Sequence, residues 1–76
     1  MALLDRITRD PEVMNGKPCL RGMRITVGTL VGLVAAGHSN AEILAAYPYL
    51  DQEDIRQALA YSARRFDETE VLIPHA

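Results

Sequence analysis

The stretch from Gly37 to Tyr61 constrains the fold more than any other, because it contains two helix starts separated by a turn. Ser39-Asn40-Ala41-Glu42 fits a capping box, in which the serine hydroxyl and the glutamate each bond a free backbone amide. Pro48 disfavours helical geometry at Tyr47, so the first helix should stop there. Asp51 can cap a second helix that carries Ile55, Ala58, Leu59 and Ser62. Helix, tight turn, helix is the outline of a helix-turn-helix.

An earlier helix is predicted over residues 27–36, with Thr26 as its cap and Gly37 just past its end. Apolar pairs stand at the positions of a hydrophobic staple at two helix starts, and these pairs are Ile25 with Leu30 and Leu50 with Ile55. Gly28 and Gly32 lie on one side of the helix. Each costs about 1 kcal/mol relative to alanine in a helix interior, so we expect close packing there.

The N-terminal residues predict a small, irregular β element. Residues 4–8 alternate apolar and polar side chains as a short strand does. Asn15-Gly16 is a strong signal for a hairpin turn, because both central residues of a type I′ turn need positive φ. Pro18 cannot donate to a strand ladder, and Gly22 indicates a bulge or a close approach of backbone.

Length and composition indicate one small domain. The 76 residues contain 49% apolar and 24% charged side chains, which is ordinary for a globular protein. We divide them into a β arm (1–25), a three-helix core (26–66) and an acidic and apolar tail (67–76). A single cysteine suits a reducing compartment, and the apolar run 27–36 is far short of the roughly 20 residues of a membrane span. The sequence therefore predicts a cytoplasmic protein without a membrane segment.

Charge is unevenly distributed along the chain. Residues 1–38 carry five basic and three acidic side chains, whereas residues 39–76 carry three basic and seven acidic ones. The N-terminal part is therefore mildly basic and the helical half acidic, although the net charge is only −2.

Groups with catalytic or metal-binding potential have simpler interpretations. Asp51, Glu53 and Asp54 stand at a helix start, where carboxylates cap amides and interact favourably with the macrodipole. Cys19 with His38 and His75 gives no recognised zinc spacing. We therefore expect no enzyme activity, no cofactor and no metal.

DNA binding is the function that the helix-turn-helix outline raises. The N-terminal residues of its second helix would meet base edges, and the basic arm could lie along phosphates. The candidate DNA-binding residues are Lys17, Arg21, Arg24, Gln52, Arg56 and Gln57. The carboxylates at the same helix start would repel phosphate, so a solvated surface remains the simpler interpretation of this helix face.

A family resemblance joins these features. The run Asn15-Gly16-Lys17-Pro18-Cys19-Leu20-Arg21-Gly22-Met23-Arg24-Ile25-Thr26-Val27 is followed by Gly37-His38-Ser39, Glu42-Ile43 and Tyr47-Pro48-Tyr49-Leu50. This pattern resembles the "domain of unknown function 433" family over residues 4–66. Met23 departs from it, because the family usually has threonine there.

The resemblance implies a mainly α fold, with a three-helix homeodomain-like or winged helix-turn-helix core behind a small β hairpin. Such proteins look like VapB-type antitoxins, which implies a dimeric antitoxin that binds a PIN-like ribonuclease toxin and, as a complex, represses its own operon. The acidic tail suits a toxin contact, so the candidate partner-binding residues are Asp67, Glu68, Glu70, Val71, Leu72 and Ile73. The alternative is a protein-interaction module on the same scaffold without DNA contact.

Overall fold

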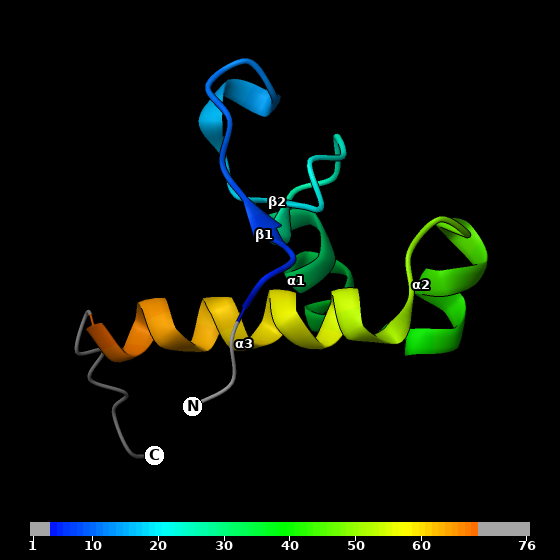
Figure 1. Cartoon of the computed structure of the whole chain (residues 1–76). Helices are drawn as coiled ribbons and strands as arrows, with labels where there is room; N and C mark the ends of the chain where they lie inside the picture. The colour runs from blue at the N-terminus through cyan, green and yellow to red at the C-terminus, as the bar shows by residue number, and fades with distance from the viewer. Residues whose placement is uncertain (1–3, 69–76) are drawn as a thin grey trace.

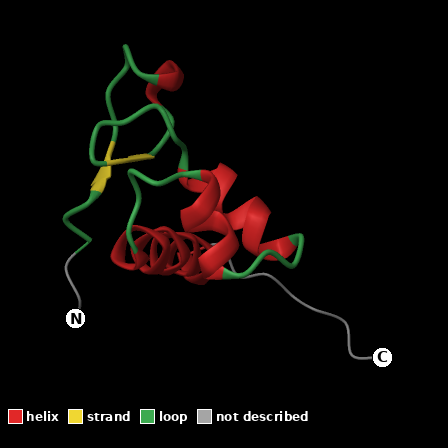
Figure 2. Ribbon diagram, turned by 90° about the vertical axis from the view of Figure 1, so that its right-hand side faces the viewer, coloured by secondary structure: helices red, strands yellow, loops and turns green. Residues whose placement is uncertain are grey.

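The chain folds as an N-terminal arm set against three helices (Figure 1). The computed structural model describes residues 4–68, with side chains described to residue 65. Its elements in order are β1 (Ile7–Thr8), a 3₁₀ turn (Met14–Gly16), β2 (Cys19–Leu20), α1 (Val27–Ala35), α2 (Asn40–Ala46) and α3 (Gln52–Glu68). A mainly helical domain with a small hairpin is therefore confirmed. Viewed from the side, the far end of the arm projects away from the helices, while its base meets them (Figure 2).

The arm forms the predicted hairpin, but the Asn15-Gly16 turn does not join its strands directly. β1 and β2 pair antiparallel, with Ile7 opposite Leu20, and residues 9–18 lie between them. Asn15 and Gly16 have φ of 58° and 79°, and the Lys17 amide donates to the Met14 carbonyl at 3.2 Å. The turn geometry is thus as predicted. Since Pro18 has no N–H to donate, the ladder starts only after it.

A second tight turn follows β2. Arg21 and Gly22 have φ of 49° and 70°, and the Met23 amide donates to the Leu20 carbonyl at 2.8 Å. The predicted close approach at Gly22 is wrong, because a Cβ there would meet no atom within 4 Å. Glycine suits this position because of its positive φ.

The predicted helix caps of α1 and α2 are confirmed. Thr26 Oγ1 accepts from the Thr29 amide at 3.0 Å, and Gly37, with φ of 93°, follows the end of α1. At the start of α2, Ser39 Oγ accepts from the Glu42 amide at 3.1 Å, while Glu42 Oε1 accepts from the Ser39 amide at 2.8 Å. These bonds satisfy amides that a helix cannot satisfy itself.

A second reciprocal cap begins α3. Asp51 Oδ1 accepts from the Asp54 amide, and Asp54 Oδ2 accepts from the Asp51 amide, both at 3.0 Å. Tyr47 ends α2 with non-helical φ and ψ of −126° and 76°, as Pro48 predicted. The end of α2 at Tyr47 and the reciprocal cap at the start of α3 fix the turn between the two helices.

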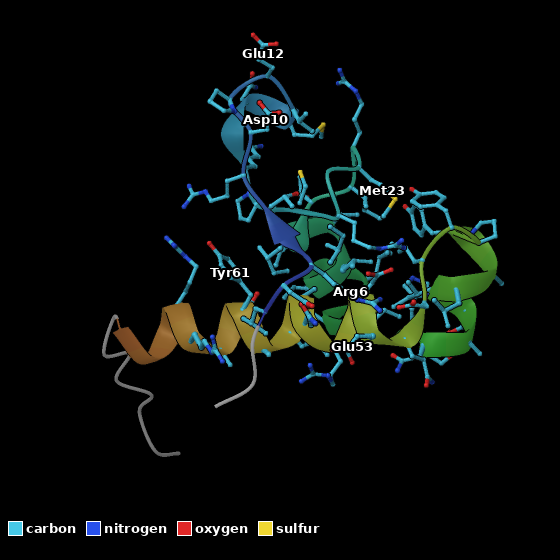
Figure 3. All side chains as sticks on the ribbon, viewed as in Figure 1. Arg6, Asp10, Glu12, Met23, Glu53 and Tyr61 are labelled. Atoms are coloured by element: carbon cyan, nitrogen blue, oxygen red, sulfur yellow. The ribbon has the colours of Figure 1, made fainter. Side chains whose placement is uncertain are left out.

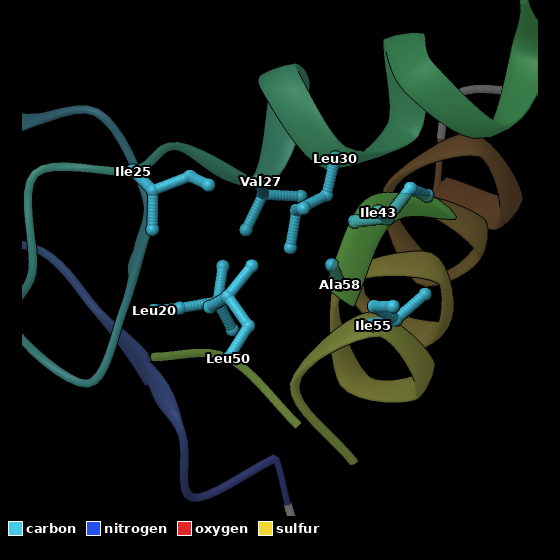
Figure 4. Packing of buried hydrophobic residues seen from close by; sticks show 8 residues of the cluster. All are labelled: Leu20, Ile25, Val27, Leu30, Ile43, Leu50, Ile55 and Ala58. Carbon is cyan, nitrogen blue, oxygen red and sulfur yellow. The ribbon is translucent and has the colours of Figure 1, made fainter. Parts of the chain in front are cut away.

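The core lies where the arm and all three helices meet (Figure 4). Both predicted staple pairs lie in it, and its buried apolar residues are Leu20, Ile25, Val27, Leu30, Ile43, Leu50, Ile55 and Ala58. Leu59, which we expected on the apolar stripe of α3, is 38% exposed. Gln57 is buried instead, because its amide bonds the arm.

The close packing predicted at the two helical glycines is wrong. A Cβ at Gly28 would meet only Thr26 Oγ1, at 3.9 Å, and one at Gly32 would meet nothing within 4 Å. Both glycines are exposed on the outer side of α1. The arm and α3 pack against the opposite side of α1, where Val27 and Leu30 lie.

Two further predictions concern the end of the chain and membranes. Asp67 and Glu68 belong to the last turn of α3, whereas Glu70, Val71, Leu72 and Ile73 lie outside the described residues. Across residues 4–68, none of the helices combines the length and apolarity that crossing a membrane requires.

Candidate functional site

The most polar region of the interior lies where the arm meets the start of α3. The Asp54 carboxylate is 0% exposed and accepts hydrogen bonds from two arginines of the arm, Arg6 and Arg21. Arg21 approaches it side-on, with Nε 3.0 Å from Oδ1 and Nη2 2.7 Å from Oδ2, and Arg6 Nη1 lies 3.1 Å from Oδ1. The same Arg6 Nη1 also forms an ion pair with the Asp51 carboxylate. We call Arg6, Arg21, Asp51 and Asp54 the arginine–aspartate clamp.

The clamp sets the charge state of its buried carboxylate. Burial alone would raise the pKa of Asp54, but hydrogen bonds from Arg21, the Asp51 amide and Arg6 outweigh it, so the pKa lies below its usual value. The bond to Asp54 in turn raises the pKa of each guanidinium. Both partners are therefore ionised, and the arm is held by fixed charges.

Gln57 extends this polar contact along α3. Its Nε2 donates to Asp5 Oδ1 at 2.9 Å and to Glu53 Oε2 at 2.8 Å, while its Oε1 accepts from the Arg6 amide at 2.9 Å. The Gln57 side chain thus contacts residues that lie 51 and 52 positions before it in the sequence. Figure 3 shows Arg6 over the first turns of α3, where Glu53 also lies.

Glu53 and Arg56 form an ion pair on the outside of the same turns. Arg56 donates from Nε at 2.7 Å and from Nη2 to the two carboxylate oxygens. The hydrogen bond from Arg56, followed by that from Gln57, lowers the pKa of Glu53 to about 2. The positive charge of Arg56 is therefore matched by a neighbour three residues away.

The structure separates the predicted DNA-binding residues into two groups. Gln57 is 3% exposed with its amide fully engaged, so it offers nothing to a base edge. Arg21 is committed to Asp54 and also donates to the Tyr49 carbonyl at 2.8 Å. These two residues are better explained as internal contacts.

The other predicted DNA-binding residues face solvent. Lys17, Arg24, Gln52 and Arg56 are all exposed. Lys17 and Arg24 come from separate turns of the arm, and within residues 4–68 neither side chain has an ionic partner. They are the accessible cations of the predicted site.

Sequence reasoning assigned the carboxylates at the start of α3 to capping and missed their arginine partners. Capping is correct for Asp51 and Asp54, which bond each other's amides. The missed residue is Arg6, which lies 48 positions before Asp54. The available signal was a pair of arm arginines and a surplus of carboxylates at one helix start.

Other reactive groups lie apart from this region. Cys19 is buried, and its thiol donates to the Lys17 carbonyl at 3.3 Å. His38 Nδ1 lies 3.9 Å from Glu42 at the start of α2. No group of three His, Cys, Asp or Glu side chains among residues 4–68 could hold a metal ion.

Two shallow pockets flank α2. One, of about 350 Å³, lies toward α3 and is lined by Asn40, Gln52, Glu53, Ile55, Arg56 and Leu59. The other, of about 340 Å³, lies toward the end of α1, and we call it the α1–α2 groove. It is lined by Leu33, His38, Glu42, Ile43, Ala46 and Tyr47.

These features define a small α-helical domain whose N-terminal hairpin is clamped to the start of its third helix. Comparison with known proteins identifies the family to which this domain belongs. The chain belongs to the DUF433 family, described as "Protein of unknown function (DUF433)", whose sequence model matches residues 7–62.

Two other proteins contain a domain similar to this chain. "Uncharacterized protein y4eO" of Sinorhizobium fredii is 43% identical over 56 residues, which cover 74% of this chain and 25% of that protein. The chain thus spans about a quarter of this relative's length. The crystal structure of a DUF433 member from Anabaena variabilis is 35% identical, with a TM-score of 0.76, over 83% of this chain and 62% of that one.

Proposed function

We propose that this chain is the antitoxin half of a toxin–antitoxin pair and that it works by binding a PIN-like ribonuclease toxin, without catalysis. The sequence resemblance described above motivates the proposal, since it implies a VapB-type antitoxin, whereas the family description itself names no function. Charge supports it as well, since residues 39–76 carry seven acidic and three basic side chains. A ribonuclease cleft that accepts RNA should be basic, and complementary charge favours association.

The observation that carries the proposal is the placement of charges at the start of α3. Arg21 and Gln57 are engaged inside the domain, whereas the Asp51 side chain is 57% exposed and that of Glu53 is 38% exposed. Asp51 is paired with Arg6 and Glu53 with Arg56, so these turns of α3 present matched charges and no excess of positive charge to a DNA backbone. A protein partner suits such a surface better.

The toxin contact can be tested with the full chain and the product of the adjacent gene, which the proposal expects to encode a PIN-like protein. Neutralising Asp67, Glu68 and Glu70 together as Asn or Gln should weaken binding at least tenfold in calorimetry, as loss of several complementary charges does. A control variant that neutralises Asp10 and Glu12 in the arm should bind normally. Equal binding by both variants would remove the acidic tail from the interface.

A second role, operator binding by a helix-turn-helix, is favoured by the exposure of Lys17, Arg24 and Gln52. Replacing Lys17 and Arg24 by Gln should reduce affinity for operator DNA and make its salt dependence shallower by about one unit of log–log slope for each lost phosphate contact. Glu53→Lys should raise affinity if α3 approaches phosphate. No binding at low salt, alone or with toxin, would leave the chain a protein-interaction module without DNA contact.

We further propose that the protein works as a homodimer in the cytoplasm. A chain of this size buries only roughly 60% of its unfolded surface, so a second subunit would add stability. Dimers also match the two-fold symmetry of operator sites. Sedimentation of the purified chain measures this assembly directly, and a single monomeric species would refute it.

A further inference from the structure

One continuous part of the chain is nearly free of charge although much of it faces solvent. Between Val27 and Leu50, Glu42 is the only residue among Asp, Glu, Lys and Arg, and His38 is the one histidine. This part forms α1, α2 and the turn after α2. Exposed residues there include Ala35 and Ala45. A typical protein surface has roughly 25–35% charged residues, whereas depletion of charge marks the centre of protein interfaces.

The α1–α2 groove lies within this uncharged part. Ile43 is 2% exposed and forms its floor, while the partly buried Leu33 and Tyr47 contribute walls. Ala46 is exposed beside it. The groove therefore offers an apolar depression with a small residue at its rim, to which an apolar side chain of another molecule could pack.

An aromatic surface continues the groove toward α3. The ring of Tyr47 meets that of Tyr49 edge to face, with centroids 6.1 Å apart. Tyr49 is 51% exposed, and its backbone is held by the hydrogen bond from Arg21. An exposed tyrosine on a fixed backbone has the character of an interface hot spot, since little conformational freedom is lost when it is covered.

The two ends of this surface carry opposite charge. Glu42 lines the groove at one end, 3.9 Å from His38. At the other end, Arg21 bonds the Tyr49 carbonyl while Asp54 matches its charge. Arg24, exposed and without an ionic partner among residues 4–68, follows three residues later and supplies the net positive charge. A surface that is acidic at one end and basic at the other is complementary to a copy of itself turned by a two-fold axis.

We propose that the α1–α2 groove and Tyr49 form the contact between two copies of this chain. The two-fold axis sets Glu42 of each copy toward the basic turn of the other and lays the uncharged surfaces of α2 against each other. This inference identifies the interface of the homodimer proposed above. It requires neither toxin nor DNA, so it can fail while the toxin contact stands.

The test is sedimentation equilibrium of the full chain, without toxin or DNA, over a range of concentrations. The wild type should dimerise, and Ala46→Arg should raise the dimer dissociation constant at least about tenfold, because a charge would be placed in an apolar contact. Ala63→Arg is the matched control, since Ala63 is an exposed alanine on α3 outside the groove. It should leave the dissociation constant unchanged.

Tyr49→Ala provides a second measurement and should weaken the dimer by about tenfold or more, as loss of a hot-spot side chain does. Circular dichroism checks that each variant keeps the wild-type helix content. A wild type that stays monomeric at every concentration would overturn the proposal and leave the groove to a different protein. A dimer equally tight in Ala46→Arg and Ala63→Arg would place the interface elsewhere.

Discussion

Asp54→Asn should destabilise the domain by about 2–3 kcal/mol. The carboxylate is 0% exposed and accepts from Arg6, Arg21 and the Asp51 amide. Asparagine keeps one acceptor oxygen but turns an amide group toward guanidinium donors. Breaking a buried ion pair costs about 3–5 kcal/mol, and we take less because the Arg6 and Arg21 side chains are 28% and 41% exposed and can be hydrated.

Urea unfolding followed by circular dichroism measures this loss. For a small domain with a denaturant slope near 1 kcal/mol/M, the midpoint should fall by about 2–3 M. Asp51→Asn is the matched comparison within the clamp, because Asp51 also pairs with Arg6 but is 57% exposed, and asparagine caps a helix as well as aspartate does. It should cost less than about 1 kcal/mol. All samples need the same protein concentration, since dimerisation would shift the midpoint.

A loss of similar size in the two variants would show that the clamp is an ordinary surface ion pair. A double-mutant cycle sharpens the test. If Arg21 acts through Asp54, then Arg21→Gln in the Asp54→Asn background should cost clearly less than it costs in the wild type. Additive losses would refute the direct coupling that the 2.7 Å contact implies.

Four further predictions concern acid, two glycines and a helix cap. Because the pKa of Asp54 is lowered and that of Glu53 is about 2, their stabilisation is complete above their ordinary pKa values and is lost as pH falls through the lowered ones. Thermal midpoints should therefore drop between about pH 4 and pH 2, and less so in Asp54→Asn. Gly32→Ala should stabilise the domain by up to about 1 kcal/mol in urea titrations, since the added Cβ meets no atom. Gly37→Ala should destabilise it, because Gly37 has φ of 93°. Ser39→Ala should cost about 1 kcal/mol in the same assay by removing one half of a capping box.

The features that the sequence predicted well are those decided within four residues. The caps at Thr26 and Ser39 and the turn at Asn15-Gly16 each depend on a donor and acceptor that are close along the chain. Their geometry follows from local chemistry, whatever the rest of the molecule does. Predicting the hairpin that pairs Ile7 with Leu20 also required the effect of Pro18. Proline cannot donate to the ladder, so the pairing lies further from the Asn15-Gly16 turn.

The arrangement of the candidate site could not be predicted in this way. The bonds from Arg6 and Arg21 to Asp54 span 48 and 33 residues, so they depend on how the arm docks on α3. Gln57 was predicted to contact DNA because of its place near the start of the second helix of a helix-turn-helix, although it lies one turn after Asp54 on the same inner side of α3. Its burial is favourable only because Asp5 and the Arg6 amide bond it.

The clamp limits what the proposed operator contact can use. Arg21 is held by Asp54 and Arg56 by Glu53, which leaves Lys17 and Arg24 as the accessible cations of the predicted site. Two phosphate contacts per copy would give a log–log salt slope near −2, and near −4 for a dimer. Such a slope, abolished in the Lys17 and Arg24 variant, would assign DNA binding to the arm. A markedly steeper slope would require that the paired arginines open on DNA, and Asp54→Asn should then raise the affinity.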